Sequence, residues 1–350
     1  MSKIEVKIEK LKNSEIEIKG SVPFENLQKH REKAVKSISE NISVDGFRKG
    51  HVPEKIVIEQ VGEMSILNEM AELALQDAYP TIIMENKLDI IGSPQVSITK
   101  IAEGNPMEFT IKTVVMPEIK LADYKKIAKK VNSAKEEKIE VTEEEVENTV
   151  KQIQTGQAQQ SHTCEGDSCS HDKDQKEELP EVNDEFVKKL GDFKDVADFK
   201  AKLKDDIKTQ KEKQEVEKKR MNTIEEIAKE TKIDLPEILI ETELRKMTAE
   251  MQDNIARMGL QFDKYLEHIK KTEEDLKKEW RPDAEKRVKI QMVLGKIAGE
   301  EKVVPNEDEV KKNVETLMAQ YKDANKDNVE IYVKMLISNE EVFKFLEAQK

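Results

Sequence analysis

The residues best suited to binding chemistry lie between Gly46 and Pro53, in the sequence Gly-Phe-Arg-Lys-Gly-His-Val-Pro. An aromatic ring and two cations, Phe47, Arg48 and Lys49, stand between glycines. Glycine adopts positive φ without steric cost, and proline fixes φ and cannot continue a helix. The segment therefore predicts a tight, exposed loop tip. Such a tip suits a surface that is part protein and part phosphate; a helix–helix turn with an incidental phenylalanine is the alternative.

A second cluster of ligand-type side chains consists of two histidines and two cysteines, at His162, Cys164, Cys169 and His171. Together they could give zinc four ligands in a tetrahedral arrangement. The spacing is not that of a standard zinc finger, because each histidine is only two residues from a cysteine. An acidic linker that happens to hold these side chains is the alternative. We expect no structural metal and no cofactor.

The sequence holds no catalytic motif. His30, His51 and His268 have no evident nucleophile partner, and Walker-type phosphate loops and GxSxG elbows are absent. Without a nucleotide site, any action on a partner must be independent of ATP, and release must come from weak, fast contacts. We therefore expect a binding protein rather than an enzyme.

Seven of the 13 methionines lie at or after Met221, in the helical part of the chain. Methionine is flexible and polarisable, so a methionine-bearing surface fits many unrelated apolar segments. Core packing between helices is the alternative for any single residue. The predicted binding set is Met247, Met251, Met258, Met292, Met318 and Met335.

The elements around the loop are predicted from hydrophobic periodicity. Strands are expected at Lys3–Lys10, Ser14–Gly20, Gln95–Ile101 and Met107–Met116, and helices at Phe24–Glu40 and Ile56–Glu85. Two hairpins with intervening helices make an α+β domain.

From Val196 onward the pattern is almost entirely helical, with apolar residues three and four apart. Pro236 should open one helix and Gly259 close it, whereas Pro282 should kink or restart the next. Lys208–Glu215 has no large apolar residue and should be exposed to water. The stripe expected on the last helix is Ile331, Met335, Phe343 and Leu346.

The region between these two parts is polar. Leu121–Lys138 is rich in lysine and has little apolar periodicity. Glu143–Gln154 should be helical, because Thr142 followed by Glu145 is a capping-box start. Thr155–Glu178 is rich in Gln, Ser, Asp and Glu and contains no aromatic residue.

Composition limits the classes of partner. Charged residues make up 38% of the 350 residues, aromatic residues 4%, and the formal net charge is -13. Such a chain does not bind DNA as a whole, and any RNA contact must come from a local basic patch. The helix before the loop could extend that patch through Lys29, His30, Arg31, Lys33 and Lys36. An ordinary solvated helix face is the alternative. With no apolar run of about 20 residues and no signal-peptide pattern, we expect a cytoplasmic protein without membrane partners.

Gly46–Pro53 resembles the ribosome-docking signature of the trigger factor family, bacterial chaperones that meet nascent chains at the ribosomal tunnel exit. Only His51 departs from the usual pattern. The likeness extends to the order of elements over the first 118 residues, to Leu179–Phe186 and to Arg281–Val288. It implies docking on protein and rRNA of the large ribosomal subunit, and makes a homodimer plausible. The docking residues that it implies are Gly46, Phe47, Arg48, Lys49, Gly50 and Pro53.

The resembled family carries an inserted peptidyl-prolyl isomerase domain of the FK506-binding type. Here the 24 residues of Thr155–Glu178 stand in its place. Such a domain needs roughly 90–100 residues and an apolar, aromatic-lined pocket. We therefore expect the isomerase domain to be absent.

We predict an α+β fold in which an N-terminal ribosome-binding domain is joined by an extended linker to an elongated all-α chaperone domain. The predicted boundaries are 1–118 for the first domain, 119–140 for the linker, 141–154 for the first helix of the chaperone domain, 155–178 for a short disordered segment, and 179–350 for the remaining helices. The expected function is an ATP-independent chaperone that docks through Gly46–Pro53 and holds nascent polypeptides. An off-ribosome holdase or assembly scaffold is the alternative, and a prolyl isomerase a third.

Overall fold

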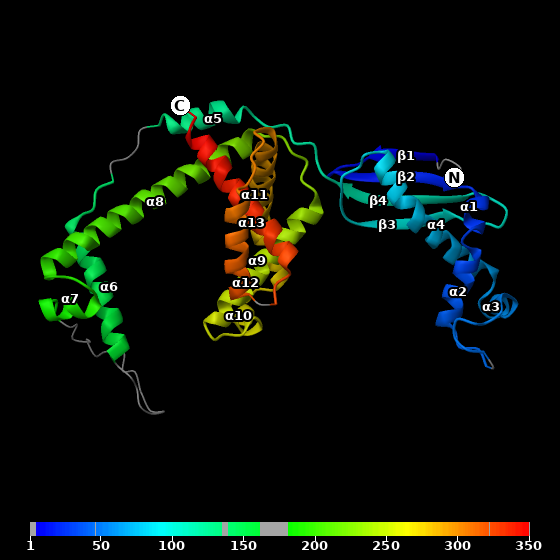
Figure 1. Ribbon diagram of the computed structural model, residues 1–350, viewed down its shortest axis with the longest axis horizontal. Helices are drawn as coiled ribbons and strands as arrows, with labels where there is room; N and C mark the ends of the chain where they lie inside the picture. Colours follow the sequence, from blue (N-terminus) through cyan, green and yellow to red (C-terminus); the bar gives the residue numbers. More distant parts are fainter. Residues whose placement is uncertain (1–4, 46, 135–138, 162–180, 322, 350) are drawn as a thin grey trace. The chain divides into compact units, whose positions relative to one another are not determined.

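The computed structural model describes residues 5–45, 47–134, 139–161, 181–321 and 323–349 (Figure 1). The chain forms two compact units, one of residues 1–122 with 228–302 and one of residues 123–227 with 303–350. The polypeptide therefore passes between the units three times. Each unit combines segments that are far apart in the sequence.

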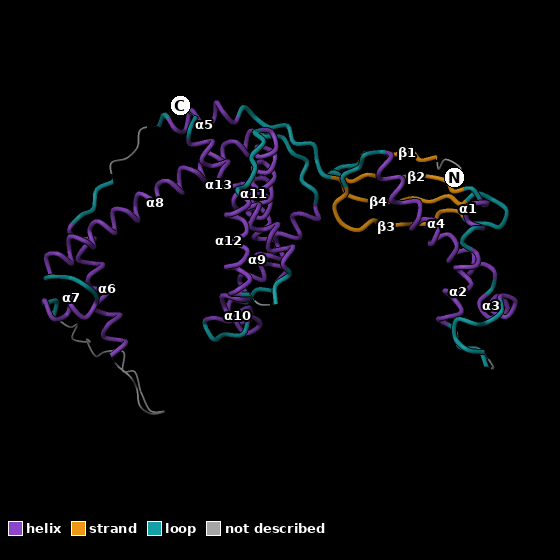
Figure 2. The backbone as a smooth tube through the Cα atoms, viewed as in Figure 1, coloured by secondary structure: helices purple, strands orange, loops and turns teal. Residues whose placement is uncertain are grey.

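The first unit begins with an antiparallel sheet in the order β1-β2-β4-β3 (Figure 2). Its strands are β1 (Glu5–Lys10), β2 (Glu15–Val22), β3 (Ile90–Lys100) and β4 (Met107–Val115). The two predicted hairpins join through β2 and β4, with Ile18 opposite Ile111 and Gly20 opposite Phe109. Because side chains alternate along a strand, these residues share one face, and Ile18, Phe109 and Ile111 are buried there.

Four helices lie between β2 and β3 in the chain. They are α1 (Phe24–Gln28), α2 (Arg31–Asn41), α3 (Glu54–Val61) and α4 (Glu63–Glu85). α4 buries one face in the same hydrophobic core as the sheet. The expected single helix at Phe24–Glu40 is wrong: the N–H of His30 donates to the carbonyl of Leu27 in a tight turn that separates α1 from α2. Gly62, with φ of 80°, separates α3 from α4.

The rest of the first unit is helical. It consists of α9 (Glu237–Arg257), α10 (Phe262–Ile269) and α11 (Glu273–Glu300). α9 and α11 pack together through Ile240, Leu244 and Ala284. The predicted start of α9 after Pro236 is confirmed. Pro282 lies inside α11 without ending it, so the predicted restart does not occur.

The segment before α9 contacts the sheet. The hydroxyl of Ser14 donates to the backbone carbonyl of Asp234 at 2.8 Å, and the N–H of Ser14 donates to the Asp234 carboxylate at 3.0 Å. Lys120 and Lys232 form an antiparallel bridge. These contacts place residues 228–302 in one unit with the sheet.

The second unit holds the remaining helices. They are α5 (Tyr124–Asn132), α6 (Glu143–Ser161), α7 (Asp184–Leu190), nearly all of α8 (Val196–Glu230), α12 (Glu307–Gln320) and α13 (Lys326–Glu347). Val146, Phe186 and Phe199 form a small core of α6, α7 and α8. α12 and α13 share another core. The linker region contains α5, which buries Ile127 and Ala128 and contacts α13.

α8 is a single helix whose middle, Lys208–Glu215, is mostly exposed, as predicted. Near its end, Arg220 donates to both carboxylate oxygens of Glu340 at 3.0 Å and to Glu347 at 2.6 Å. These hydrogen bonds raise the pKa of Arg220 above its ordinary value, and the bond accepted by Glu347 has the largest effect. Although α8 has 35 residues, neither it nor any other described helix is long and apolar enough to cross a membrane.

The stripe predicted for α13 is wrong at one position. Ile331 is 67% exposed, whereas Val333 and Ile337 are buried against α12. α13 carries two neighbouring apolar stripes, and periodicity does not show which of them packs against the partner helix. Ile331 itself faces solvent.

Candidate functional site

The loop between α2 and α3 is fixed at both ends. Val44 packs against the core before the tip, and Val52 is 7% exposed after it. The N–H of Gly50 donates to the carbonyl of Ser39 at 2.9 Å, and the N–H of Phe47 donates to the carbonyl of Val44 at 3.1 Å. The backbone of the loop is therefore closed onto the end of α2.

Gly50 is required by backbone conformation. Its φ is 79°, in the left-handed region that favours glycine. A Cβ added there would lie 3.1 Å from Cγ of Glu40. Both facts oppose any larger residue at this position, and they explain why a glycine follows the two cations.

The tip presents the predicted side chains to solvent. Phe47 is 41% exposed, and Arg48 and Lys49 are also exposed. Among the described residues, no salt bridge involves either cation. Pro53 is exposed and precedes α3, while Gly46 lies outside the described residues. The arrangement is an apolar ring beside two cations at the end of an anchored loop.

Other basic residues near the loop are partly neutralised. Arg31 forms ion pairs with Glu54, at 2.7 Å, and with Glu63. The hydrogen bond that Arg31 donates to Glu63 is the largest cause that raises the pKa of Arg31 above its ordinary value. His30 lies 3.9 Å from Asp77. Arg31 thus braces the start of α3 against the start of α4, and Lys33 and Lys36 are left as exposed cations on α2.

The predicted metal ligands cannot be placed. His162, Cys164, Cys169 and His171 lie outside the described residues. Within the described part of the chain, no group of three or more His, Cys, Asp or Glu side chains is arranged to hold a metal ion.

The predicted methionine set is spread over both units. Met258 is 66% exposed, just after α9. Met247 packs beside the core of α9 and α11, and Met318 packs beside that of α12 and α13. The partly buried members are Met247, Met251, Met292, Met318 and Met335.

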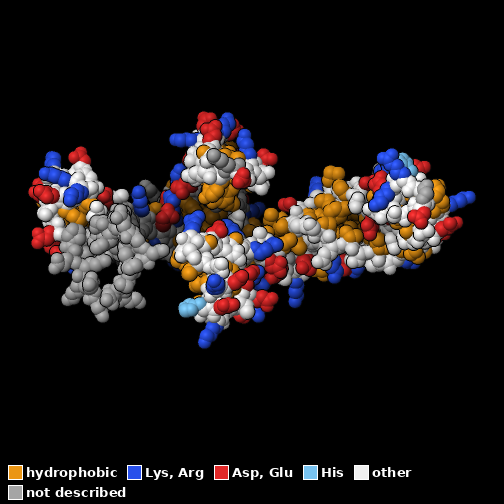
Figure 3. Space-filling view, turned by 90° about the horizontal axis from the view of Figure 1, so that it is seen from below, with side chains coloured by type: hydrophobic (Ala, Val, Ile, Leu, Met, Phe, Trp, Pro, Cys, Tyr) orange, Lys and Arg blue, Asp and Glu red, His pale blue; other side chains and the backbone are white. Residues whose placement is uncertain are grey.

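Sequence reasoning missed most of the exposed apolar surface next to these methionines. On α13, Ile331 and Tyr332 are 67% and 47% exposed, and Leu336 is 45% exposed. Leu260 is exposed beside Met258. The space-filling view shows hydrophobic side chains reaching the surface among the charged ones (Figure 3). A signal for this apolar surface was present in the sequence. Two neighbouring apolar pairs lie one helical turn apart, at Ile331, Tyr332, Met335 and Leu336.

Two models of known families match this chain. One, "Bacterial trigger factor protein (TF)", matches residues 4–153, and the other, "Bacterial trigger factor protein (TF) C-terminus", matches residues 195–347. The chain belongs to the trigger factor family. The predicted resemblance is confirmed, and the α+β first region with a helical remainder agrees with it.

Curated trigger factors align over most of their length. That of Macrococcus caseolyticus is 25% identical over 416 residues, covering 97% of this chain and 95% of that protein. That of Bacillus cytotoxicus is 27% identical over 393 residues, covering 90% and 91%. A solved structure from work on promiscuous substrate recognition in folding and assembly by the trigger factor chaperone matches the fold, with a TM-score of 0.56, 17% identity and coverage of 99% of this chain and 100% of that one. Family membership supports a chaperone role.

The two family models leave residues 154–194 unmatched. The alignment with the Macrococcus caseolyticus protein is longer than this chain, so at least 66 of its positions (416 less 350) hold no residue of this chain. The relative therefore carries residues that this trigger factor lacks. No isomerase domain is among the matched models.

Proposed function

We propose that this trigger factor docks on the large ribosomal subunit at the tunnel exit through the Gly46–Pro53 loop and holds nascent chains on apolar surfaces of its helices. The observation that carries the docking step is the exposed tip of Phe47, Arg48 and Lys49 on an anchored loop. The ring offers apolar contact to ribosomal protein, and the cations offer charge to rRNA phosphates.

The charge balance favours a local contact. The chain carries a formal net charge of -13, so its overall field opposes approach to RNA. Docking through one small basic tip restricts the contact to a single orientation. It also makes binding sensitive to salt, because each neutralised phosphate releases counterions.

The holding step rests on exposed apolar side chains of the helices. Ile331, Tyr332 and Leu336 on α13, with Met258 and Leu260 after α9, are each at least 45% exposed. Exposed apolar patches on a charged protein mark binding surfaces. Ribosome docking would raise their effective concentration near the emerging chain, so weak and rapidly reversible contacts suffice without ATP.

We propose no prolyl isomerase activity for this chain. The 24 residues of Thr155–Glu178 are too few for that domain, which needs roughly 90–100 residues.

The cytoplasm, where ribosomes are found, is the proposed location, and a homodimer is the proposed candidate assembly. An off-ribosome scaffold for partly folded proteins is the alternative function, and ribosome co-sedimentation distinguishes it from docking.

The test is co-sedimentation with vacant bacterial ribosomes. The variant replaces Phe47, Arg48 and Lys49 by alanine. The matched control replaces Lys10, Leu11 and Lys12, because Leu11 is also exposed (43%) between two lysines in a turn. We expect saturable binding by the intact chain and the control, and loss of binding in the variant. Equal binding by all three proteins, or none, would contradict docking through the loop and favour the scaffold.

A further inference from the structure

A second apolar surface lies in the first unit, in a groove between α4 and β3. β3 is an edge strand, paired with β4 on one side only within the described sheet. The face that is fully buried on β2 and β4 is partly open on β3. Val96 is 48% exposed there, although its cross-strand partner Ile111 is buried.

The groove has a volume of about 660 Å³. α4 contributes Leu75 and Tyr79, and β3 contributes Pro94, Val96 and Ile98. This volume is in the range of protein sites that enclose a ligand. The groove is therefore large enough to receive apolar side chains from another molecule.

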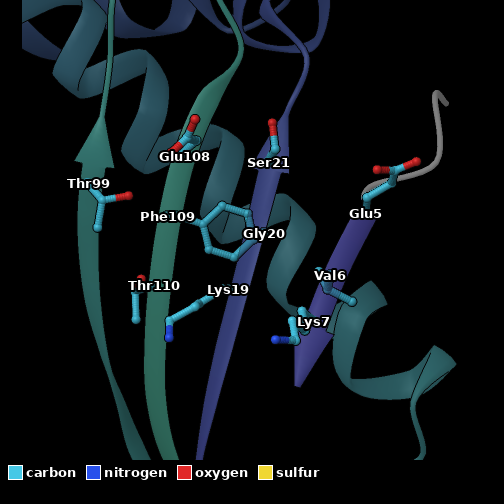
Figure 4. Close-up of a pocket in the computed structure, with 10 residues that line it drawn as sticks. All are labelled: Glu5, Val6, Lys7, Lys19, Gly20, Ser21, Thr99, Glu108, Phe109 and Thr110. Carbon is cyan, nitrogen blue, oxygen red and sulfur yellow. The ribbon is translucent and has the colours of Figure 1, made fainter. Parts of the chain in front are cut away.

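The opposite face of the same sheet has a different character. A hollow of about 600 Å³ lies there, and Figure 4 shows Lys7, Lys19 and Glu108 around it. The face with the charged lining is solvated, whereas the groove beside α4 is apolar.

The outer edge of β3 offers backbone groups to a ligand. Gln95, Val96, Ser97 and Ile98 pair with β4 in continuous register, after an irregularity between Ile91 and Gln95. An edge strand has N–H and C=O groups that no neighbouring strand satisfies. An added strand would use these groups and would place every second side chain over the groove.

We propose that the α4–β3 groove binds an extended apolar segment of an unfolded polypeptide, which adds to the free edge of β3. The exposed carboxylate of Glu72 on the groove favours a segment that carries a cation at that end. The inference goes beyond the helical surfaces described above. It rests on the proposed holding function only in taking an unfolded chain as the occupant.

The test measures fluorescence anisotropy of a short labelled peptide of alternating leucine and threonine with a terminal lysine. The full chain carries Ile331→Ser and Leu336→Ser, so that the α13 surface does not contribute. In this background we expect Val96→Asp to weaken binding about ten-fold or more. Ser97→Asp is the matched control, because Ser97 is exposed on the opposite face of the same strand.

Backbone pairing is tested with the same peptide N-methylated at alternate positions along one edge. We expect it to lose binding, because methylation removes the donors that an added strand needs. Thermal melts identify any variant that fails to fold, and Val96→Ser repeats the test without a charge. Equal binding by Val96→Asp and Ser97→Asp, or full binding by the methylated peptide, would overturn the proposal. Self-association that Val96→Asp abolishes and the peptide does not displace would assign the groove to a second copy instead.

The two proposals fail separately. Intact ribosome docking and client holding by the chain, together with peptide binding that is equal in Val96→Asp and Ser97→Asp, would remove only the groove. Peptide binding that depends on Val96 in a chain with no ribosome binding or holding activity would remove only the proposed function.

Discussion

The side-chain nitrogen of Asn132, at the end of α5, lies 2.9 Å from the backbone carbonyl oxygen of Leu346, near the end of α13. The same amide also donates to the carbonyls of Glu347 and Gln349, at 3.2 and 2.8 Å. The last carbonyls of a helix have no partner within the helix. Asn132 therefore caps the C-terminal end of α13 from a helix that is distant in sequence.

Asn132→Ala should lower the free energy of unfolding by about 1 kcal/mol, because it removes the amide donor that these carbonyls share. Asn132→Asp should cost more, since a carboxylate accepts hydrogen bonds and repels carbonyl oxygens. Urea unfolding measures the change, and amide exchange should quicken at the end of α13. Ser133→Ala, one residue further along the chain, is the control. Equal stability of Asn132→Ala and the intact chain would show that water replaces the amide.

A pH effect is expected at the contact between α9 and α11. Arg281 donates to Glu237 at 2.7 Å, and this hydrogen bond lowers the pKa of Glu237 below its ordinary value of 4.5. A lowered pKa in the folded state means that the contribution is present above the unfolded pKa and is lost as pH falls through the folded one.

The thermal midpoint should therefore fall more steeply below about pH 5 in the intact chain than in Glu237→Gln. Melts over a series of acidic buffers measure this difference. Glu241→Gln is the control, because Glu241 is exposed on the same helix. An equally reduced slope in both variants would mean that the ion pair with Arg281 contributes no more to the pH dependence than an exposed glutamate does.

The exposed stripe of α13 should be needed for holding. Ile331→Ser with Leu336→Ser should reduce suppression of client aggregation several-fold, with little change in melting temperature, because both side chains are exposed. Light scattering of a diluted unfolded client measures the effect. Lys334→Ser, exposed on the same helix, should behave like the intact chain. Unchanged suppression by the double variant would place the holding surface elsewhere.

Two glycines should respond oppositely to alanine. Gly50→Ala should destabilise the chain by about 1 kcal/mol, because alanine is strained at positive φ. Gly295→Ala, in α11, should stabilise it by about the same amount, because a helix favours alanine and no atom lies within 4 Å of the added Cβ. Urea unfolding of both variants checks the signs. A neutral Gly50→Ala would indicate that the loop relaxes to another backbone conformation.

Local patterns in the sequence predicted the hairpins, because Ile16 and Ile18 alternate with polar residues over a whole strand. They did not predict that β2 pairs with β4, since that pairing joins residues about ninety positions apart, such as Ile18 and Ile111. They also missed α5, where only Ile127 and Ala128 are buried. A short helix among lysines has too few apolar positions to show a period.

The candidate docking loop was predictable because its glycines, proline and cations are contiguous. Its anchoring was not, because the acceptor for Gly50 is the backbone of Ser39, which no side-chain pattern reveals. The α4–β3 groove was missed for a similar reason. In the sequence Val96 alternates with polar neighbours, as a buried strand residue does. In the structure α4 does not cover it, and local periodicity does not show this.

α8 joins two contacts through a solvent-exposed middle, so the number of residues between them sets the angle between the contacts about the helix axis. At about 1.5 Å per residue its 35 residues span roughly 50 Å. Phe199 belongs to one small core, and Arg220 pairs with α13. Removing a single residue between them would rotate one contact by about 100° relative to the other, whereas removing two whole turns would nearly restore the alignment. The length of this solvated stretch can therefore vary only in steps of whole turns.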